Sequence, residues 1–535
     1  MSSSVPASSA SDENAAAEKS RILWLLVGVV VCAAVLRVFR LGHQSLWFDE
    51  GTTLDMTDGR SFVENFKRFY HLFTGGERFQ PLYNLALPYW RLAFGDSEVA
   101  LRSFSTLASF GAVVFVTLSA YRLYGGEHAI WTAALAATSS FAVFYAQEAR
   151  PYALLMALSS AQIFCLTPML AGRPDDETRG WRFAHVIVVA IGAFGSIFFC
   201  IFSAALAGAQ LVVQCRPREW LRWWLPALVA AIPALIFFLG TGQARDPMHS
   251  ISVARHGFPV AESIIFVVYG VLVGITYGPS VLDLHSNQRW MMLREHLGEI
   301  VALIVVLAAV TAVLARVLWT SEGQRSEQRS ASLVLLVAAV LVMIPATVLA
   351  VMTGVTWLPR HSFYLWAPIV LLVPLVRHVG GARGRSVGVW LIVAFLGLNL
   401  YSLYKHYFRY DYSKGDYRGV AEYVMAKENA QTPSVLAYGF MRLLRYYGDT
   451  RTMDAAVLTG PELVGKVRAL THDAPAVLVI LNHEEFWQKR YGADIPTLLG
   501  GTYALTDTTE FHTFKVFHFA LNGSPGEGGA PAPGR

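Results

Sequence analysis

Long apolar segments, separated by short polar links, dominate the first three quarters of the chain. Each is close to the roughly 20 residues that an α-helix needs to cross a bilayer. The pattern therefore predicts a polytopic α-helical membrane protein with about 11 transmembrane helices. The segment 183–214 is barely long enough for two spans, and counting it as one would invert the sidedness of everything after it. The predicted spans are 22–40, 98–121, 128–146, 150–171, 183–200, 201–214, 222–240, 299–318, 331–353, 361–378 and 386–404.

Two further apolar segments, 81–94 and 262–279, do not fit this alternation. As full spans they would place the links that follow them on the wrong side. The first is rich in Tyr and Trp, which are typical of the membrane–water interface. We therefore expect both segments to form helices that lie in the outer interface.

The charge of the links predicts their sides, because arginine-rich loops are retained in the cytoplasm. Links around Arg179, Arg216, Arg325 and Arg383 are arginine-rich and are expected inside. This places the N-terminus in the cytoplasm and the C-terminus outside. The same parity places outside the links that carry Asp49-Glu50, Gln147–Arg150 and Pro359–His361. Arg37 and Arg40 oppose the charge rule, since they stand at the outer end of the first span.

From about Lys405 the composition changes to that of a small α/β domain. Residues 416–428 read as a helix, and 434–438, 477–481 and 513–519 read as strands. We expect an extracytoplasmic domain at 405–522, after a membrane domain at 21–404 whose first external loop is 41–97. The two ends, 1–20 (Ser/Ala-rich and polar) and 523–535 (Gly/Pro-rich), are predicted to be disordered.

Composition supports a membrane protein and excludes several other classes. The chain is 54% hydrophobic and only 15% charged, where a soluble domain has about 25% charged residues. Arginines in short loops account for the net charge of +5, so no nucleic-acid partner is indicated. Four cysteines lie in or beside apolar segments without metal-like spacing, and we interpret them as packed small hydrophobes: Cys32, Cys165, Cys200 and Cys215.

Asp49 and Glu50 follow an aromatic pair at the point where the chain leaves the first span. Inverting glycosyl transfer needs one general base beside the acceptor hydroxyl, whereas a lipid-phosphate leaving group is already a stable anion and needs no acid. One carboxylate and a few arginines, the best bidentate partners of phosphate, would form a minimal site. The alternative is a solvated interfacial loop in which Trp47 anchors and the acids face water.

Three other links carry candidate residues. Glu148 and Arg150 stand between two spans and could pair, either in a site or as the ion pair of a polar turn. Arg360 starts a late span between Trp357 and Trp366. It could clamp a phosphate with its flanking tryptophans packed toward lipid, or it could be an ordinary snorkelling arginine. Glu98 and Arg102 are four residues apart on one helix face, so we favour a structural ion pair there.

Several of these residues belong to a series of short motifs that is typical of a known family. The motifs occur in the order Arg40-Leu41-Gly42, Ser45–Glu50, Pro81-Leu82-Tyr83, Phe94–Arg102 and Tyr145–Tyr152. Together they resemble the bacterial branch of the GT-C glycosyltransferases related to protein O-mannosyltransferases and the lipid A aminoarabinose transferase. The resemblance covers about residues 22–405. It is strong over the first 155 residues and looser later, where Pro359-Arg360-His361 resembles a Pro-Arg-Tyr span start.

The resemblance implies a function and a location. The donor would be a polyprenyl-phosphate-linked sugar, used on the outer face of a bacterial cytoplasmic (inner) membrane. The acceptor would be an envelope protein, lipid or polysaccharide. The catalytic base would be Asp49 or Glu50, of which we prefer Asp49. The residues expected to bind donor phosphate or substrate are Arg150, Glu148, Arg360, His361, Tyr83, Gln80 and Arg102.

The sequence also departs from the family. Where many members carry His-Pro-Pro before Leu-Tyr, this chain has Phe79-Gln80-Pro81. The stretch 195–198, Gly-Ser-Ile-Phe, lacks a polar His or Tyr that many members carry between the fifth and sixth spans. No His/Asp cluster with metal spacing is evident, so we predict no obligatory metal cofactor, although a divalent metal is not excluded.

Two other functional classes stay open at this stage. A transporter or flippase for a lipid-linked saccharide should show paired repeats and broken helices at mid-membrane, and the sequence shows no internal repeat. A non-catalytic assembly protein for an envelope polysaccharide would use the external domain to bind a partner. The change Asp49→Asn separates these classes, because only an enzyme should lose its activity.

Overall fold

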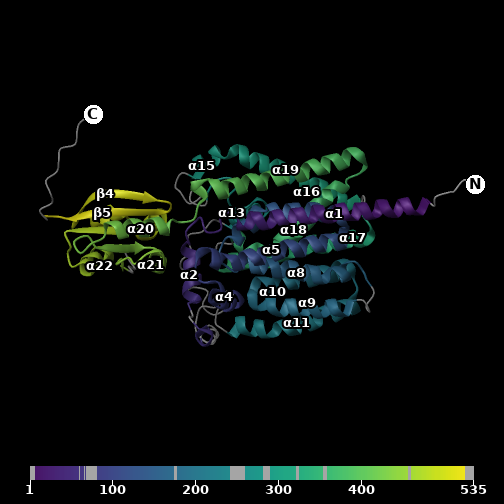
Figure 1. Cartoon of the computed structure of the whole chain (residues 1–535), viewed down its shortest axis with the longest axis horizontal. Coiled ribbons are helices and arrows are strands. Elements are labelled where there is room, and N and C mark those ends of the chain that lie inside the picture. The colour runs from purple at the N-terminus through teal and green to yellow at the C-terminus, as the bar shows by residue number, and fades with distance from the viewer. Residues whose placement is uncertain are drawn as a thin grey trace, which may run out of the picture. The chain divides into compact units, whose positions relative to one another are not determined.

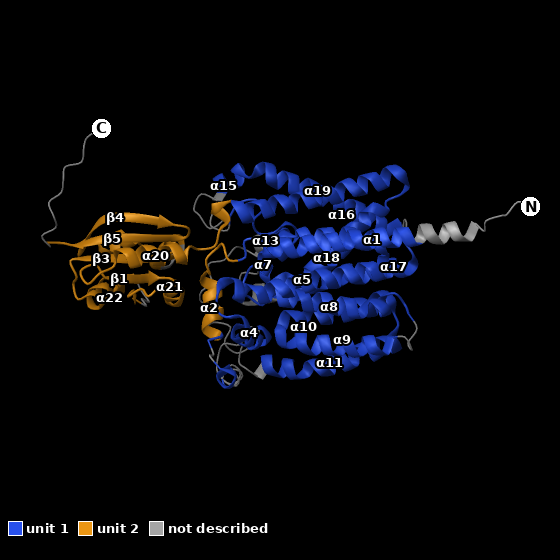
Figure 2. Ribbon diagram, in the orientation of Figure 1, with its two compact units in different colours: residues 1–41, 57–281, 290–408 blue, residues 42–56, 282–289, 409–535 orange. Residues whose placement is uncertain are grey.

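The fold was analysed in a computed structural model of the chain. It describes residues 7–523 except 59–60, 66, 68–80, 174–177, 241–259, 281–288, 321–323, 354–357 and 456–459. The chain forms two compact units (Figure 2). We call residues 1–41, 57–281 and 290–408 the membrane unit, and residues 42–56, 282–289 and 409–535 the C-terminal unit. The second unit thus contains a segment from the first predicted loop.

Helices account for almost all of the described chain up to residue 408 (Figure 1). Besides α2 (Phe48–Met56), they are α1 (Ala7–Val38), α4 (Pro81–Phe94), α5 (Glu98–Tyr124), α6 (Gly126–Thr138), α7 (Ser140–Ala146), α8 (Tyr152–Leu170), α9 (Arg179–Gly195), α10 (Ile197–Gln214), α11 (Pro217–Gly240), α13 (Val260–Val273), α15 (Arg289–Glu295), α16 (Leu297–Thr320), α17 (Ser326–Thr353), η2 (Pro359–Leu365), α18 (Trp366–Leu372), η3 (Val373–His378) and α19 (Gly381–Phe408).

The helical membrane fold is confirmed, but the count of about 11 spans is not. Within the described residues, eight helices are long and apolar enough to cross a membrane, or nine if the bent pair α6–α7 is one span. Two predicted spans fall short for different reasons. Helix α9 has only 17 residues. The predicted span 361–378 lies in a region built of three short helical pieces, and Pro374, which lacks a backbone N–H, stands at the start of the last piece.

The segment 183–214 forms two helices, α9 and α10, and their junction is at Ser196 rather than after residue 200. Ser196 is extended (φ −171°, ψ 145°), and its side chain caps α10 by accepting from the Phe198 N–H at 3.2 Å. A Cβ at Gly192 would lie 2.3 Å from the Phe199 ring. Glycine therefore allows the two helices to approach closely at this junction.

The predicted span 128–146 is broken at Ser139 into α6 and α7, which are bent by 52°. The Ser139 hydroxyl accepts from the Ala142 N–H at 3.3 Å and from the Trp366 indole at 3.0 Å. Arg37 donates to the carbonyls of Ala136 and Ala137, at 3.0 and 3.2 Å. A broken helix leaves carbonyl groups without helical partners, and Arg37 satisfies two of them. This explains why an arginine stands at this end of the first span against the charge rule.

The N-terminal segment corrects another expectation. Helix α1 begins at Ala7, so Ala7–Ser20 is helical and the prediction of disorder does not hold there. The segment contains Ala, Glu and Lys, which are good helix formers. A helix already started in the apolar segment can extend through them at one hydrogen bond per residue. The first six residues and most of the predicted C-terminal tail lie outside the described part of the chain.

The C-terminal unit contains a five-stranded sheet of order β2-β1-β3-β5-β4. The predicted helix and three strands are confirmed as α20 (Tyr417–Lys427), β1 (Ser434–Tyr438), β3 (Ala476–Asn482) and β5 (Phe514–Leu521). The sequence reading missed β2 (Met453–Asp454), which has two residues, and β4 (Tyr503–Phe511), which is largely exposed and polar. The connecting helices are α21 (Met441–Tyr447), α22 (Glu462–Thr471), α23 (Glu484–Tyr491) and α24 (Ile495–Leu499).

Strands β1 and β3 are parallel, whereas β5 is antiparallel to both β3 and β4. Strand β3 is buried almost throughout. One hydrophobic cluster joins the sheet to α22, α23 and α24, through side chains such as Val467 and Trp487. Tyr417 of α20 instead packs edge-on against Phe514 of β5. A strand buried on both faces reads as a continuous apolar run, which is why the sequence identified β3.

Candidate functional site

Gln147, the residue after α7, ties three helix ends of the membrane unit together. Its side-chain amide donates to the carbonyls of Arg37 and Phe39 at 3.1 and 2.8 Å, and its oxygen accepts from His406 Nε2 at 3.1 Å. These contacts join the ends of α1 and α19 to the turn 147–150. The turn that carries Glu148 and Arg150 is therefore held rigidly from both sides.

A polar stripe on α5 supports the same turn. Arg102, Ser105, Thr106 and Ser109 recur at the helical spacing i, i+3, i+4 and i+7. Ser105 donates to the Arg150 carbonyl at 3.0 Å, Thr106 to the Ala146 carbonyl at 2.9 Å, and Ser109 to the Ala142 carbonyl at 3.1 Å. The sequence reading missed the three hydroxyl residues. Their spacing was the signal that could have identified them, because polar residues on a buried helix face need partners.

Tyr83 and Arg102, both predicted to bind substrate, are almost fully buried in this arrangement. The Tyr83 hydroxyl lies 2.9 Å from Ser105 Oγ. Because Ser105 uses its proton on the Arg150 carbonyl, Tyr83 is the donor. Arg102 donates to the Leu41 carbonyl at 3.0 Å. Their observed contacts thus support the protein framework, and their substrate contacts stay a prediction. Gln80 lies outside the described residues.

Glu148 and Arg150 differ in exposure. Glu148 is 1% exposed, whereas Arg150 is half-buried. The Arg150 guanidinium donates to the Tyr152 hydroxyl at 3.3 Å and lies 5.6 Å from the centre of that ring. Tyr152 in turn packs edge-on against Tyr145. The aromatic pair therefore orients Arg150, and direct pairing between Glu148 and Arg150 stays a prediction.

Arg360 and His361 lie in η2, which packs against α8, α10 and α13. The His361 ring stacks on Phe198 of α10 with ring centres 5.6 Å apart. A Cβ at Gly270 of α13 would meet the Pro359 ring at 2.5 Å. The packed turn leaves Arg360 and His361 half-buried. Trp366 is 1% exposed and bonds to Ser139, so its predicted lipid-facing role is wrong. Trp357 is outside the described residues.

Asp49 and Glu50 occupy the first turn of α2, where the helix dipole favours negative charge. Their environments differ. Glu50 is fully buried, accepts from the Trp47 N–H at 3.4 Å and lies 3.7 Å from the ammonium of Lys414. Asp49 is half-buried. The two adjacent acids are therefore distinguished by burial and by a cation that the sequence reading missed.

Tyr417 is a buried neighbour of this acid pair. Burial raises the pKa of Tyr417 above its ordinary value, and the negative charge of Asp49 raises it further. The hydroxyl accepts from the Phe440 N–H at 3.1 Å and from the Asn482 side chain at 3.2 Å. The phenol is therefore a neutral group near Asp49 and stays protonated at physiological pH.

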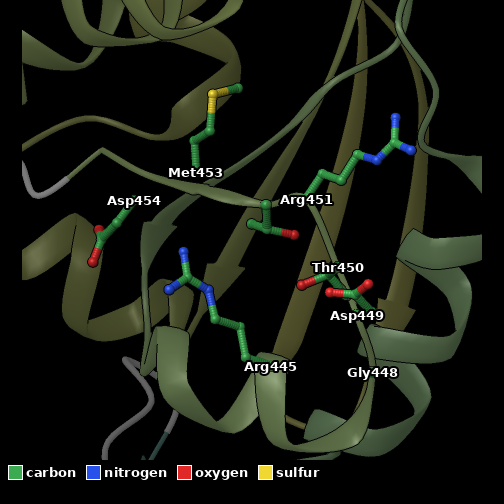
Figure 3. A pocket seen from close by; sticks show the side chains of 8 residues that line it. Arg445, Gly448, Asp449, Thr450, Arg451, Met453 and Asp454 are labelled. Atoms are coloured by element: carbon green, nitrogen blue, oxygen red, sulfur yellow. The ribbon is translucent and has the colours of Figure 1, made fainter.

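A shallow hollow of about 600 Å³ lies elsewhere in the C-terminal unit, between α21 and β2. Figure 3 shows the Arg445 side chain rising from α21 between Asp454 and Thr450. The Arg451 side chain points away from Arg445. The lining of the hollow combines cations, carboxylates and hydroxyls, and consists of Arg445, Gly448, Asp449, Thr450, Arg451, Thr452, Met453 and Asp454. Such a surface offers both donors and acceptors to a polar ligand.

Metal ligands were searched for over the described part of the chain. No group of three or more His, Cys, Asp or Glu side chains there is arranged to hold a metal ion. The prediction that no metal is obligatory stays a prediction.

Comparison with known proteins identifies the fold. No family model matches the sequence, and no curated protein matches it. Among solved structures, ArnT from Cupriavidus metallidurans bound to undecaprenyl phosphate matches with a TM-score of 0.50 and 13% identity, covering 92% of this chain and 97% of that one. The archaeal oligosaccharyltransferase AglB from Archaeoglobus fulgidus, in complex with an inhibitory peptide and a dolichol-phosphate, matches with a TM-score of 0.51 and 10% identity, covering 95% and 75%. The chain therefore has the fold of GT-C glycosyltransferases.

Proposed function

We propose that this chain is a membrane glycosyltransferase that moves a sugar from a polyprenyl-phosphate-linked donor to an envelope acceptor. Both compared structures hold a polyprenyl phosphate, undecaprenyl phosphate in one and dolichol-phosphate in the other. Their shared fold with this chain supports a lipid-phosphate donor. The acceptor is a protein, a lipid or a polysaccharide, and the reaction takes place on the outer face of the bacterial cytoplasmic membrane.

The observation that carries the mechanism is the contrast between the two acids of α2. Glu50 is fully buried beside Lys414, so it has no access to an acceptor. Asp49 is half-buried and remains accessible. We therefore assign Asp49 as the general base. The acceptor oxygen attacks the anomeric carbon as its proton passes to the Asp49 carboxylate. The bond from that carbon to the phosphate oxygen breaks, the lipid phosphate leaves as an anion, and the configuration inverts.

Arg150 and Arg360 are the proposed partners of the donor phosphate. Each is half-buried in a packed turn, Arg150 beside the Tyr152 ring and Arg360 in η2. A guanidinium held in this way can form two parallel hydrogen bonds to phosphate oxygens. Because the contacts with Tyr152 already orient Arg150, little conformational entropy is lost when that side chain binds. His361, Glu148, Tyr83, Gln80 and Arg102 are assigned supporting roles around the donor.

The C-terminal unit is proposed to hold or select the acceptor. Its hollow near Arg445 and Asp454 presents charged donors and acceptors, which the hydroxyl groups of a sugar or the polar groups of a peptide could match. In this proposal the carboxylates of the hollow bind the acceptor and take no part in the transfer of the sugar, because Asp49 is the general base.

The proposed orientation can be tested by labelling intact cells with an impermeant thiol reagent. A cysteine placed at Gly448 should react, because the C-terminal unit is proposed to be extracytoplasmic. Cysteines placed at Arg216 and Arg383 should react only after the cells are opened. Labelling of the Arg383 position from outside would overturn the orientation.

The test of the function is Asp49→Asn in the full-length protein. Loss of a general base lowers turnover by about 10²- to 10⁴-fold. We expect that loss with unchanged affinity for undecaprenyl phosphate. Asp55→Asn is a matched control on the same helix. Asp55 is 48% exposed and forms an ion pair with Arg442 of α21 at 3.0 Å. An exposed pair contributes about 0–1 kcal/mol, so its loss should alter turnover by less than about fivefold.

Turnover can be followed with membranes of the producing cells as the source of lipid-linked sugar. Mass spectrometry of envelope glycans and lipids, with and without the gene, identifies the product. Wild-type transfer by Asp49→Asn would exclude Asp49 as the base, and an unchanged envelope without the gene would favour a non-catalytic role.

A further inference from the structure

The loop segment 42–56 is built into the C-terminal unit through one backbone carbonyl and two side chains. Arg418 of α20 donates to the Gly42 carbonyl at 3.2 Å, and the Lys414 N–H donates to the Gln44 side-chain oxygen at 3.1 Å. The Ser45 hydroxyl donates to the Gly415 carbonyl at 2.6 Å. Every contact joins the first loop to residues that lie about 370 positions later in the chain. The chain before α2 is thus anchored to residues 414–415 and to the first turn of α20.

Helix α2 itself packs into the same unit. The Phe48 ring lies 5.4 Å from Phe440, edge-on, and 6.5 Å from Tyr438, nearly parallel. A Cβ at Gly51 would lie 2.6 Å from the Phe440 ring and 2.9 Å from Leu443. Glycine lowers helix stability, and its presence here permits the close approach of α2 and α21. The position of α2 is therefore fixed by the C-terminal unit rather than by local sequence alone.

The most buried contact is the ion pair of Glu50 with Lys414. The Glu50 side chain is 0% exposed and that of Lys414 is 5% exposed, with 3.7 Å between the charged atoms. Removing one partner of a buried pair leaves the other charge without compensation, which is strongly destabilising. Glu50 directly precedes Gly51 and directly follows Asp49. The ion pair thus holds the residue next to Asp49, so it influences where the Asp49 carboxylate lies.

We propose that Lys414 is a positioning residue for the transfer reaction: by pairing with Glu50 it holds α2 against the rest of the C-terminal unit and sets the electrostatic environment of Asp49. This inference rests on the proposed function for the role of Asp49. It also changes the role of the C-terminal unit, because a unit that holds the base is part of the catalytic machinery as well as a holder of the acceptor.

The docking has a test that does not depend on activity. In the detergent-purified full-length protein, Lys414→Met should increase hydrogen exchange of the backbone amides of α2 by at least about tenfold. Lys414→Arg keeps the cation and should retain most of the protection. Arg468→Met is the matched control, since Arg468 forms an exposed ion pair with Asp473 in the same unit, away from α2. Unchanged exchange in α2 for Lys414→Met would overturn the docking.

The proposed effect of Lys414 on the charge environment of Asp49 predicts a shift in the pH dependence of kcat/KM. In Glu50→Gln the negative charge of Glu50 is removed while the Lys414 ammonium keeps its charge, so the ionised form of Asp49 is favoured. The acidic limb of kcat/KM should move down by about 0.5–1 pH unit, since Asp49 is half-exposed and the interaction is partly screened. In the double variant Glu50→Gln/Lys414→Met both charges are absent, and the limb should return to the wild-type position. A purely structural role would lower turnover without this reversal.

The other titratable or charged groups near α2 are the same in all these variants, so they do not produce the shift. They are Asp55 of α2, Tyr417 and Arg418 of α20, Tyr438 of β1, and Arg442 and Tyr447 of α21.

The two proposals fail in different ways. If Asp49→Asn retains transfer while Lys414→Met still releases α2, the catalytic role of Asp49 is wrong and the docking stands. If Asp49→Asn abolishes transfer while the acidic limbs of Glu50→Gln and of the wild type coincide, the electrostatic role of Lys414 is wrong.

Discussion

Two buried cations, Arg37 of the membrane unit and Lys414 of the C-terminal unit, are satisfied differently. In the membrane unit, the fully buried Arg37 donates to Ser109 Oγ at 2.9 Å and to the carbonyls of Ala33, Ala136 and Ala137 at 3.0–3.2 Å. In the C-terminal unit, the buried Lys414 lies against the carboxylate of Glu50. Neutral dipoles surround the first cation, whereas an opposite charge faces the second.

This difference separates two tasks. A guanidinium has five donors in a fixed fork, so Arg37 can hold the carbonyls that the break at Ser139 exposes, and its task is geometric. A single ammonium that faces a carboxylate changes the charge around the next residue. Lys414 can therefore influence the ionisation of Asp49, and Arg37 has no such acid among its hydrogen-bond partners.

The largest expected effect concerns the geometric task. Arg37→Met removes four hydrogen bonds and leaves the carbonyls of the broken helix without their donors, so stability should fall by about 3 kcal/mol or more. Arg37→Lys should recover only part, because its ammonium has three donors. Thermal unfolding in detergent measures both variants. Arg385→Met, an exposed position, is the control, and equal unfolding of all variants would show that the break does not need Arg37.

The close approach of α2 can be tested by adding one methyl group. Gly51→Ala should push against Phe440 and Leu443 and destabilise the docking by about 1–3 kcal/mol. The matched change Gly465→Ala, on α22, meets no atom within 4 Å. It should stabilise its helix by about 0.5–1 kcal/mol. We expect faster hydrogen exchange of the α2 amides in Gly51→Ala and slower exchange of the α22 amides in Gly465→Ala. Stabilisation by both changes would contradict the packing of α2 against α21.

A prediction of similar size concerns the donor. Arg360→Ala should weaken the binding of undecaprenyl phosphate roughly ten- to a hundredfold, since a charge-assisted hydrogen bond contributes about 1.5–3 kcal/mol. Arg360→Lys should recover part of this, because a point charge replaces a fork. Arg383→Ala, at an exposed position near the start of α19, is the control in the same detergent binding assay. Unchanged affinity of Arg360→Ala for undecaprenyl phosphate would indicate that Arg150, rather than Arg360, binds the phosphate.

The sequence alone determined the elements whose environment is uniform along their length. Apolar runs such as 98–121 predict helices because a bilayer leaves the backbone no other partners, and α5 follows. The continuous apolar run of β3 predicted a buried strand, because a strand with both faces buried carries apolar residues at successive positions. The acidity of Asp49-Glu50 and the basic character of Arg150 and Arg360 were also legible, since they depend only on residue type.

Only the tertiary structure decided the features that join distant residues. Ser139 breaks a predicted span because Trp366 and Arg37 supply the hydrogen bonds that a broken helix needs. Nothing in the local pattern distinguishes Asp49 from Glu50. Lys414, 364 positions after Glu50 in the sequence, buries one and leaves the other half-exposed. Periodicity reports the environment of a single segment, whereas the ionisation and placement of a side chain depend on which remote groups the fold brings beside it.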